Sequence, residues 1–170
     1  MLYIAYRGLF EGENPQAENT PNQIGLAFNN GFAVMVDVWR VDNKLYLGSD
    51  QPITEVSALY LQGKKFWLNL RNSDAQSWFP TQSSRLYPQY FHQTVSSEPY
   101  VTVSDGRTWV FSEFQQTPVD NQSVMCQPEI PDRGLLSTVH YKNYGVCSMF
   151  CKFIKRIRQE GNSMYNWMPF

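Results

Sequence analysis

The chain has 170 residues, of which 42% are hydrophobic, 15% are aromatic and only 17% are charged. This length can bury one hydrophobic core, so we expect a single compact unit. The formal net charge of −1 excludes a general electrostatic attraction to nucleic acid or to an anionic membrane. An average domain has about 25% charged residues, and the lower fraction here predicts a surface that lies against another molecule.

The sequence carries no signal for membrane insertion or secretion. No apolar run approaches the ~20 residues that a membrane-spanning helix needs. Met1 leads directly into a strand-like run without a basic segment, so we expect no cleaved secretory signal. Cys126, Cys147 and Cys151 are an odd set without a C-x-x-C motif, which predicts reduced thiols. We therefore expect an intracellular, reducing compartment or incorporation into an assembly.

The first part of the chain alternates between strand and helix. Thr20 is a good N-cap residue and Pro21 suits the first helical position, so a helix should begin there and stop at Asn29-Asn30-Gly31. The run 32–38 is almost continuously apolar, which is typical of a parallel strand buried on both faces. Strands are expected at 2–6, 32–38, 44–47 and 65–70, with 44–47 paired to the strand before it.

The rest of the chain is predicted to contain short strands and few helices. Short helical segments are expected at 59–61 and 74–79, and a longer helix at 149–160. Short strands are expected at 89–93, 100–103, 108–111, 123–127 and 145–148.

This order of elements predicts the fold class. Strand–helix alternation followed by many short strands favours an α/β fold with a parallel barrel. A TIM (β/α)8 barrel usually takes ~250 residues, so this one would be a compact, stripped-down TIM-like barrel with several helices replaced by loops. We expect the barrel over 1–150, followed by a basic amphipathic helix and an aromatic tail over 151–170.

Four short motifs follow one another near the start of the chain: Ala5-Tyr6-Arg7-Gly8, Glu18-Asn19-Thr20, Asp37-Val38 and Gly48-Ser49-Asp50. Their order and spacing resemble the opening of the glycerophosphodiester phosphodiesterase family, a compact phospholipase-C-like TIM barrel. In that family the first motif reads Ala-His-Arg-Gly and the fourth reads Gly-His-Asp. Weaker matching pieces extend the resemblance over residues 2–150: 38–39, 45–48, 67–72, 90–93, 108–111 and 145–148.

The resemblance implies a phosphodiesterase site whose chemistry is lost. Active members use two histidines as general acid and base, a divalent cation held by carboxylates, and an arginine on the phosphate. Tyr6 and Ser49 stand at the two histidine positions. A phenol with a pKa near 10 is a weak acid–base group at neutral pH, and a serine hydroxyl does not titrate there.

The positions implied for the metal are also changed. Met35 stands where the first carboxylate of a Glu-x-Asp pair belongs, Asp37 keeps the second, and Asn69 replaces a further ligand. A thioether and a neutral amide are poor ligands for Mg²⁺ or Ca²⁺, so we expect no metal and no cofactor. Glu18 and Asp50 keep the residue types of the family motifs.

The surviving charged residues have two possible roles. Arg7 could bind an anion at the barrel mouth, or it could pair with Glu18, Asp37 or Asp50 in place of the missing cation, and we favour the ion pair. Asp37 is expected to pair with Arg7 or Arg71. His92 could join Arg7 and Arg71 on an anion at the mouth, or it could be a structural histidine.

The C-terminal tail is rich in residues that prefer interfaces. Tyr165, Trp167, Met168 and Phe170 are unusual for a disordered tail, which is poor in aromatics. Aromatic residues and methionine are enriched at the cores of protein interfaces. The tail could fold back on the barrel or insert into a partner.

Together these features predict a catalytically inactive phosphodiesterase-like barrel that acts as a structural or interaction subunit of a larger assembly, such as a viral particle or an organellar complex. Its partners would be other protein subunits, with no specific nucleic acid. Two alternatives stay open. One is a non-hydrolysing binder with weak affinity for a phosphorylated small molecule, and the other is a divergent phosphodiesterase that uses Tyr6 and Asp50 in new roles.

Overall fold

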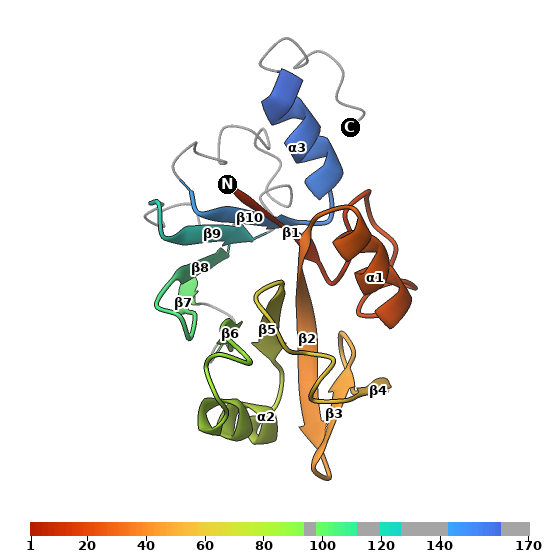
Figure 1. Ribbon diagram of the computed structural model, residues 1–170, viewed down its shortest axis with the longest axis vertical. Helices are drawn as coiled ribbons and strands as arrows, with labels where there is room; N and C mark the ends of the chain where they lie inside the picture. Colours follow the sequence, from red (N-terminus) through yellow and green to blue (C-terminus); the bar gives the residue numbers. More distant parts are fainter. Residues whose placement is uncertain (94–97, 112–119, 127–142, 161–170) are drawn as a thin grey trace.

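The computed structural model describes residues 1–93, 98–111, 120–126 and 143–160. Over these residues the chain is a mixed α/β protein with one curled sheet and three α-helices (Figure 1). The helices are α1 (Pro21–Asn29), α2 (Ser73–Trp78) and α3 (Cys151–Glu160). The strands are β1 (Leu2–Tyr6), β2 (Ala33–Val41), β3 (Lys44–Leu47), β4 (Thr54–Val56), β5 (Phe66–Leu70), β6 (Tyr90–Phe91), β7 (Tyr100–Thr102), β8 (Thr108–Phe111), β9 (Ser123–Cys126) and β10 (Gly145–Ser148).

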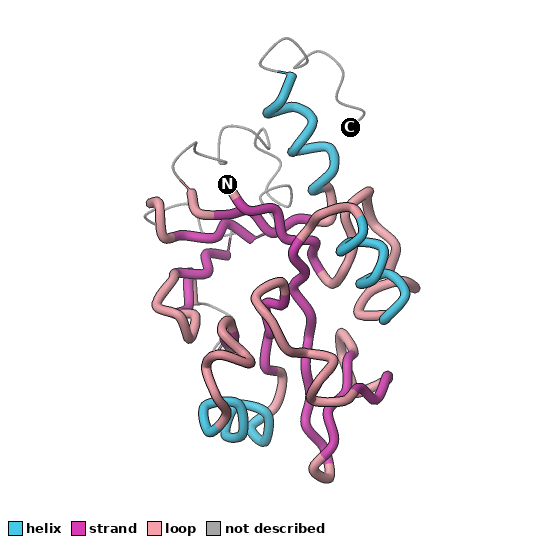
Figure 2. Tube along the Cα trace, viewed as in Figure 1, coloured by secondary structure: helices cyan, strands magenta, loops and turns pink. Residues whose placement is uncertain are grey.

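Parallel pairing dominates the sheet. The parallel neighbours run in the order β6, β5, β2, β1, β10, β9 and β8. Three short strands add antiparallel pairs, β3 on β2, β4 on β3 and β7 on β8. The sheet bends round as a half-barrel, as the ribbon and tube views show (Figures 1 and 2).

The expected TIM-like barrel is confirmed only as an α/β fold with a curled, largely parallel sheet. Within the described residues no strand pairing joins β6 to β7 or β8. β6 has only two residues, which leaves little backbone for a further strand to pair with. Ser104, in the turn after β7, hydrogen-bonds to β6 instead. Ser104 N donates to Tyr90 O at 2.9 Å, and Ser104 Oγ accepts from Tyr90 N at 2.9 Å.

The predicted helix start is confirmed. Thr20 caps α1, since its hydroxyl accepts from Gln23 N at 3.3 Å. The helix buries Ile24 and Ala27 against the sheet. At the other end of the described chain, α3 contacts β1 and β10, which joins this helix to the same sheet.

The two faces of the sheet have different compositions. On β2, Val34, Val36 and Val38 belong to the core cluster that includes residues of α1 and α2. Alternate residues point the other way, toward what we call the inner face. This face is lined by a second cluster: Ile4, Ala33, Met35, Trp67, Phe91, Val101, Val103, Trp109, Val124, Cys126 and Cys147. Its centre is aromatic, because Phe91 stacks on Trp109 with ring centroids 4.4 Å apart and Trp67 lies 5.7 Å from Trp109.

One local prediction was wrong, and one short strand was not predicted. Residues 59–61 were expected to be helical, but they lie in turns, where Tyr60 N donates to Ser57 Oγ at 3.1 Å. β4 was not predicted, because three residues are too short for a clear alternating pattern. The tail residues Tyr165, Trp167, Met168 and Phe170 lie outside the described residues.

Two further observations concern the cysteines and the helices. All three cysteines are buried, and none of them is in a disulfide. In the described part of the chain, no helix has the length and apolarity needed to cross a membrane.

Candidate functional site

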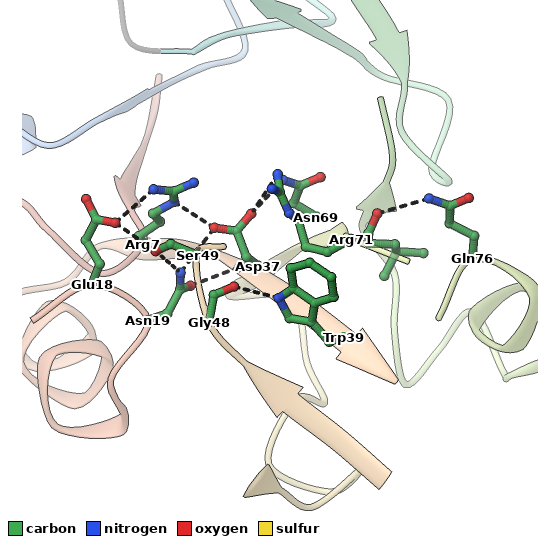
Figure 3. Close-up of polar contacts among 11 residues, drawn as sticks. Arg7, Glu18, Asn19, Asp37, Trp39, Gly48, Ser49, Asn69, Arg71 and Gln76 are labelled. Atoms are coloured by element: carbon green, nitrogen blue, oxygen red, sulfur yellow. Dashed lines mark hydrogen bonds and ion pairs between the residues drawn. The ribbon is translucent and has the colours of Figure 1, made fainter. Parts of the chain in front are cut away.

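The candidate site lies on three neighbouring parallel strands, beside the ends of β1 and β5 and at the middle of β2. Arg7 directly follows β1, Asp37 lies in β2, and Asn69 lies in β5. The register pairs Asp37 with Asn69, so their side chains emerge on the same face at the same level. These residues point toward one another and form one hydrogen-bonded group (Figure 3).

Asp37 is the centre of this group and its side chain is fully buried. Arg7 Nε lies 2.6 Å from Asp37 Oδ2 as an ion pair, and Asn19 Nδ2 donates to the same oxygen at 3.1 Å. Asn69 Nδ2 donates to Oδ1 at 2.7 Å, and Arg71 Nη1 lies 3.8 Å from it. Burial raises the pKa of the Asp37 carboxyl, and the two guanidiniums and the two amides act against this rise.

Arg7 is held by a second carboxylate. Its Nη1 donates to Glu18 Oε2 at 2.8 Å, and the same oxygen accepts from Ser49 Oγ at 2.8 Å. Burial disfavours the charged guanidinium, but Asp37, Tyr6 and Glu18 together raise the pKa of Arg7 above its ordinary value. Arg7 is therefore a permanent cation, and both carboxylates within its reach are engaged with it.

The backbone around Arg7 is unusual. Arg7 has φ 54° and Asn19 has φ 56°, which is the left-handed region that L-residues seldom occupy. Asn19 N donates to Arg7 O at 2.9 Å, so the two left-handed residues support each other. Strained residues of this kind persist only where the surrounding contacts fix them, and they cluster at functional sites.

Tyr6 and Ser49, which the resemblance places at the two histidine positions, both lie beside charged residues of the network. Burial raises the pKa of the Tyr6 phenol, and the guanidinium of Arg7 lies 4.9 Å from its ring centroid. Ser49 donates to Glu18 and accepts from Asn19 Nδ2 at 3.0 Å. Both side chains are thus engaged by neighbouring groups of the network.

The positions that the resemblance assigns to a metal are occupied by other contacts. Met35 is 3% exposed and packs within the inner-face cluster. Asp37, two residues further along β2 on the same face, is already contacted by Arg7, Arg71 and two amides. Among the described residues, no group of three or more histidine, cysteine, aspartate or glutamate side chains is placed to hold a metal ion.

Two members of the site were not singled out from the sequence. Asn19 links the buried carboxylate of Asp37 to Ser49, and its Oδ1 also accepts from Asp37 N at 2.9 Å. Trp39 donates from Nε1 to Gly48 O at 2.7 Å, and the guanidinium of Arg71 lies 5.7 Å from its ring centroid. Asn19 had a readable signal, since asparagine is the residue after glycine that best tolerates left-handed backbone.

Two open cavities flank the buried ion pair. The first, of about 370 Å³, is lined by Arg7, Pro15, Gln16, Glu18, Asn19, Thr20, Leu47, Gly48, Ser49, Asp50, Gln51, Ile53 and Thr54. The second, of about 290 Å³, is lined by Asn69, Leu70, Arg71, Gln76, Gln93 and Phe111. The structure thus brings most of the predicted site residues together. His92 is exposed just after β6, and the hydrogen bonds and ion pairs that join Arg7, Asp37 and Asn69 do not include it.

Comparison with known proteins adds no relative. No protein-family model, no curated protein and no solved structure matches this chain. The resemblance to glycerophosphodiester phosphodiesterases therefore rests on its motifs alone. The contacts of the site make a self-neutralising polar network between two small cavities.

Proposed function

We propose that this chain is a phosphodiesterase-like protein without hydrolytic activity that serves as an interaction subunit of a larger assembly. One observation carries the loss of activity. The carboxylate of Asp37, which the family resemblance assigns to a divalent cation, is engaged by Arg7, Arg71, Asn19 and Asn69. Two guanidiniums provide the positive charge that a cation would otherwise supply.

The loss of the acid and base supports the same conclusion. Hydrolysis of a phosphodiester needs a proton donor for the leaving oxygen and a proton acceptor for the nucleophile. Tyr6 has a raised pKa and Ser49 does not titrate, so neither residue fills these roles at neutral pH. The proposal therefore treats the kept motifs as structural.

The strand order supports descent from a TIM-like barrel. Read through β1, the parallel strands follow the chain order β1, β2, β5 and β6 on one side and β8, β9 and β10 on the other. A (β/α)8 ring has this sequential order. The proposed barrel is open between β6 and β8, where the strands are shortest and where the described residues include no helix.

The assembly role rests on composition. Only 17% of the residues are charged, and the final segment contains Tyr165, Trp167, Met168 and Phe170. Side chains of these types are enriched at interface cores. The exposed aliphatic residues Ile53 and Leu59, 67% and 74% exposed, add apolar surface to the fold itself.

The test is the native mass of the protein purified under gentle conditions, with identification of the chains that copurify. A discrete complex that contains this chain, and that is lost when residues 162–170 are removed, supports the proposal. A monomer, or measurable hydrolysis of a glycerophosphodiester that depends on Asp37, contradicts it. The control is the circular dichroism spectrum of the truncated chain, which should match that of the full chain if the truncated chain folds.

The cavities favour a second candidate, a binder of a small phosphorylated molecule without cleavage. Arg71 is the observation that supports it, because its side chain is 33% exposed, lines the 290 Å³ cavity and lies 3.8 Å from Asp37. A ligand would raise the free energy of unfolding by RT ln(1 + [L]/Kd), and the melting temperature would rise with it. The test is a melting curve with glycerol phosphate, in the native protein and in Arg71→Gln.

A further inference from the structure

Two of the three cysteines face each other across neighbouring strands. Cys126 is the last residue of β9 and Cys147 lies in β10, and the parallel register pairs the two directly. Both side chains belong to the inner-face cluster, and the residues are 5% and 0% exposed. Their thiols therefore share one small space at the inner face.

This placement meets the main requirement for a disulfide. Neighbouring strands lie about 4.8 Å apart, and a disulfide joins residues whose Cα atoms are about 4.4–6.8 Å apart. Residues paired in register on parallel strands point to the same side of the sheet, so neither side chain has to cross the backbone. The bond needs only rotation of the two side chains and a small adjustment of the strands.

We propose that Cys126 and Cys147 form a site of oxidative modification, where hydrogen peroxide converts the two thiols into a disulfide between β9 and β10. The proposal does not depend on the function proposed above, because it rests only on the register of two strands.

The reaction balances in two steps. The thiolate sulfur of Cys126, the more exposed residue, attacks one oxygen of hydrogen peroxide, the O–O bond breaks, and a sulfenic acid and one water form. The sulfur of Cys147 then attacks the sulfenic sulfur, the S–O bond breaks, and a second water leaves with the thiol proton. Two thiols and one peroxide give one disulfide and two waters.

The bond would tie two neighbouring strands of the sheet together. It would close the loop of chain between β9 and β10 and fix β10, which pairs with β1. β1 leads into Arg7 and so into the polar network. Cross-linking a loop restricts the unfolded chain, so the oxidised protein should melt at a higher temperature than the reduced protein.

Cys151 provides a matched control within the same chain. It is as buried as Cys147, but it belongs to the core cluster of the opposite, helix-covered face. Its Sγ donates to Ile4 O at 3.0 Å and to Ser148 O at 3.2 Å. Because the sheet separates it from the other two cysteines, it should not join the disulfide.

The experiment treats the folded full-length chain with hydrogen peroxide, blocks remaining thiols, and maps the peptides by mass spectrometry without reduction. The expected product has lost the mass of two hydrogen atoms and contains a peptide that links Cys126 to Cys147. Cys151→Ser should form the same product. Cys126→Ser and Cys147→Ser should not, and a reductant should reverse both the mass change and the rise in melting temperature.

A second probe avoids the need for oxidation and for variants that could fail to fold. Phenylarsine oxide bridges two adjacent thiols through one arsenic atom, so the native chain should bind one equivalent on Cys126 and Cys147. A cross-link that includes Cys151 would overturn the proposal. So would the absence of both the disulfide and the arsenic adduct in the folded wild-type chain.

Discussion

Two layers of the inner face differ sharply although β2 and β5 supply residues to both. We call Met35, Trp67, Phe91 and Trp109 the aromatic layer, and Arg7, Asp37, Asn69 and Arg71 the polar layer. Met35 is followed two residues later by Asp37, and Trp67 is followed two residues later by Asn69. The same two strands therefore supply apolar contacts at one level and an ion-pair network at the next.

The two layers contribute differently to the stability of the fold. In the aromatic layer the rings pack tightly, and the buried Trp67 Nε1 has no hydrogen-bond partner among the described residues. In the polar layer both oxygens of Asp37 have partners. Burial of apolar area is the main favourable term in folding, whereas a buried ion pair contributes little net stability. We infer that the aromatic layer holds the sheet together and the polar layer fixes the strand ends.

The largest effect should come from removing the centre of the aromatic layer. Trp109→Ala deletes a ring that stacks on Phe91 and contacts Trp67, and should lower the free energy of unfolding by about 4 kcal/mol. Urea unfolding followed by circular dichroism measures this. Tyr100→Ala, at a residue 49% exposed on β7, is the matched control and should change stability little. Equal losses in the two variants would show that the aromatic layer is not the core.

The next largest effect should come from breaking the polar layer on one side only. Asp37→Leu leaves the guanidinium of Arg7 partly buried without its nearest carboxylate, and should cost about 3 kcal/mol. Replacing both partners, as Asp37→Leu with Arg7→Met, should recover part of this loss because the unpaired guanidinium of Arg7 is gone, while Glu18 and Arg71 each lose one ionic partner. Additive losses in the double variant would contradict the view that the pair is self-neutralising. The pair Arg40–Asp74, whose carboxylate side chain is 45% exposed, supplies the comparison, and Asp74→Ala should cost less than about 1 kcal/mol.

A smaller loss of free energy of unfolding is expected at Gly48, which lies directly before Ser49 beside the polar layer. A Cβ on Gly48 would lie 1.9 Å from Gln51 O, and Gly48 O also accepts the indole N–H of Trp39. Gly48→Ala should therefore shift the backbone beside Ser49 and cost about 2 kcal/mol. Gly25→Ala is the control, because its added Cβ would meet no atom within 4 Å. An unchanged midpoint for Gly48→Ala would show that this turn adapts freely.

Much of the fold could be predicted because strong local signals matched the tertiary structure. Apolar runs predicted β2 and β5, and Thr20-Pro21 predicted the start of α1. The closure of the sheet could not be predicted. It depends on β6, whose two residues carry too little pattern, and on Ser104, which meets Tyr90 from a distant turn.

The site was predicted in part. Opposite charges in neighbouring motifs indicated the pairing of Arg7 with Asp37 and Glu18, and the structure has both ion pairs. The amide of Asn19 and the ring of Trp39 could not be placed, because their roles depend on where a loop and a strand end meet. Sequence spacing gives residue types at strand ends, but it does not say which neutral group completes a network.

Tyr6 lies at the boundary between the two layers, and its replacement should have the smallest effect at neutral pH. An unfolded tyrosine loses its proton near pH 10, whereas burial raises the pKa of Tyr6 above that value in the folded chain. Above pH 10 the unfolded chain therefore binds fewer protons than the folded chain, and the free energy of unfolding falls as pH rises. Tyr6→Phe removes this contribution, so stability should decline less steeply between pH 9 and pH 11, as ~10 is the midpoint for the unfolded group. Burial also raises the pKa of Tyr3 and Tyr60, so part of the decline should remain. If the free energy of unfolding fell equally with pH in the wild type and the variant, the Tyr6 phenol would be exposed to solvent in the folded chain and would not lie at the boundary between the layers.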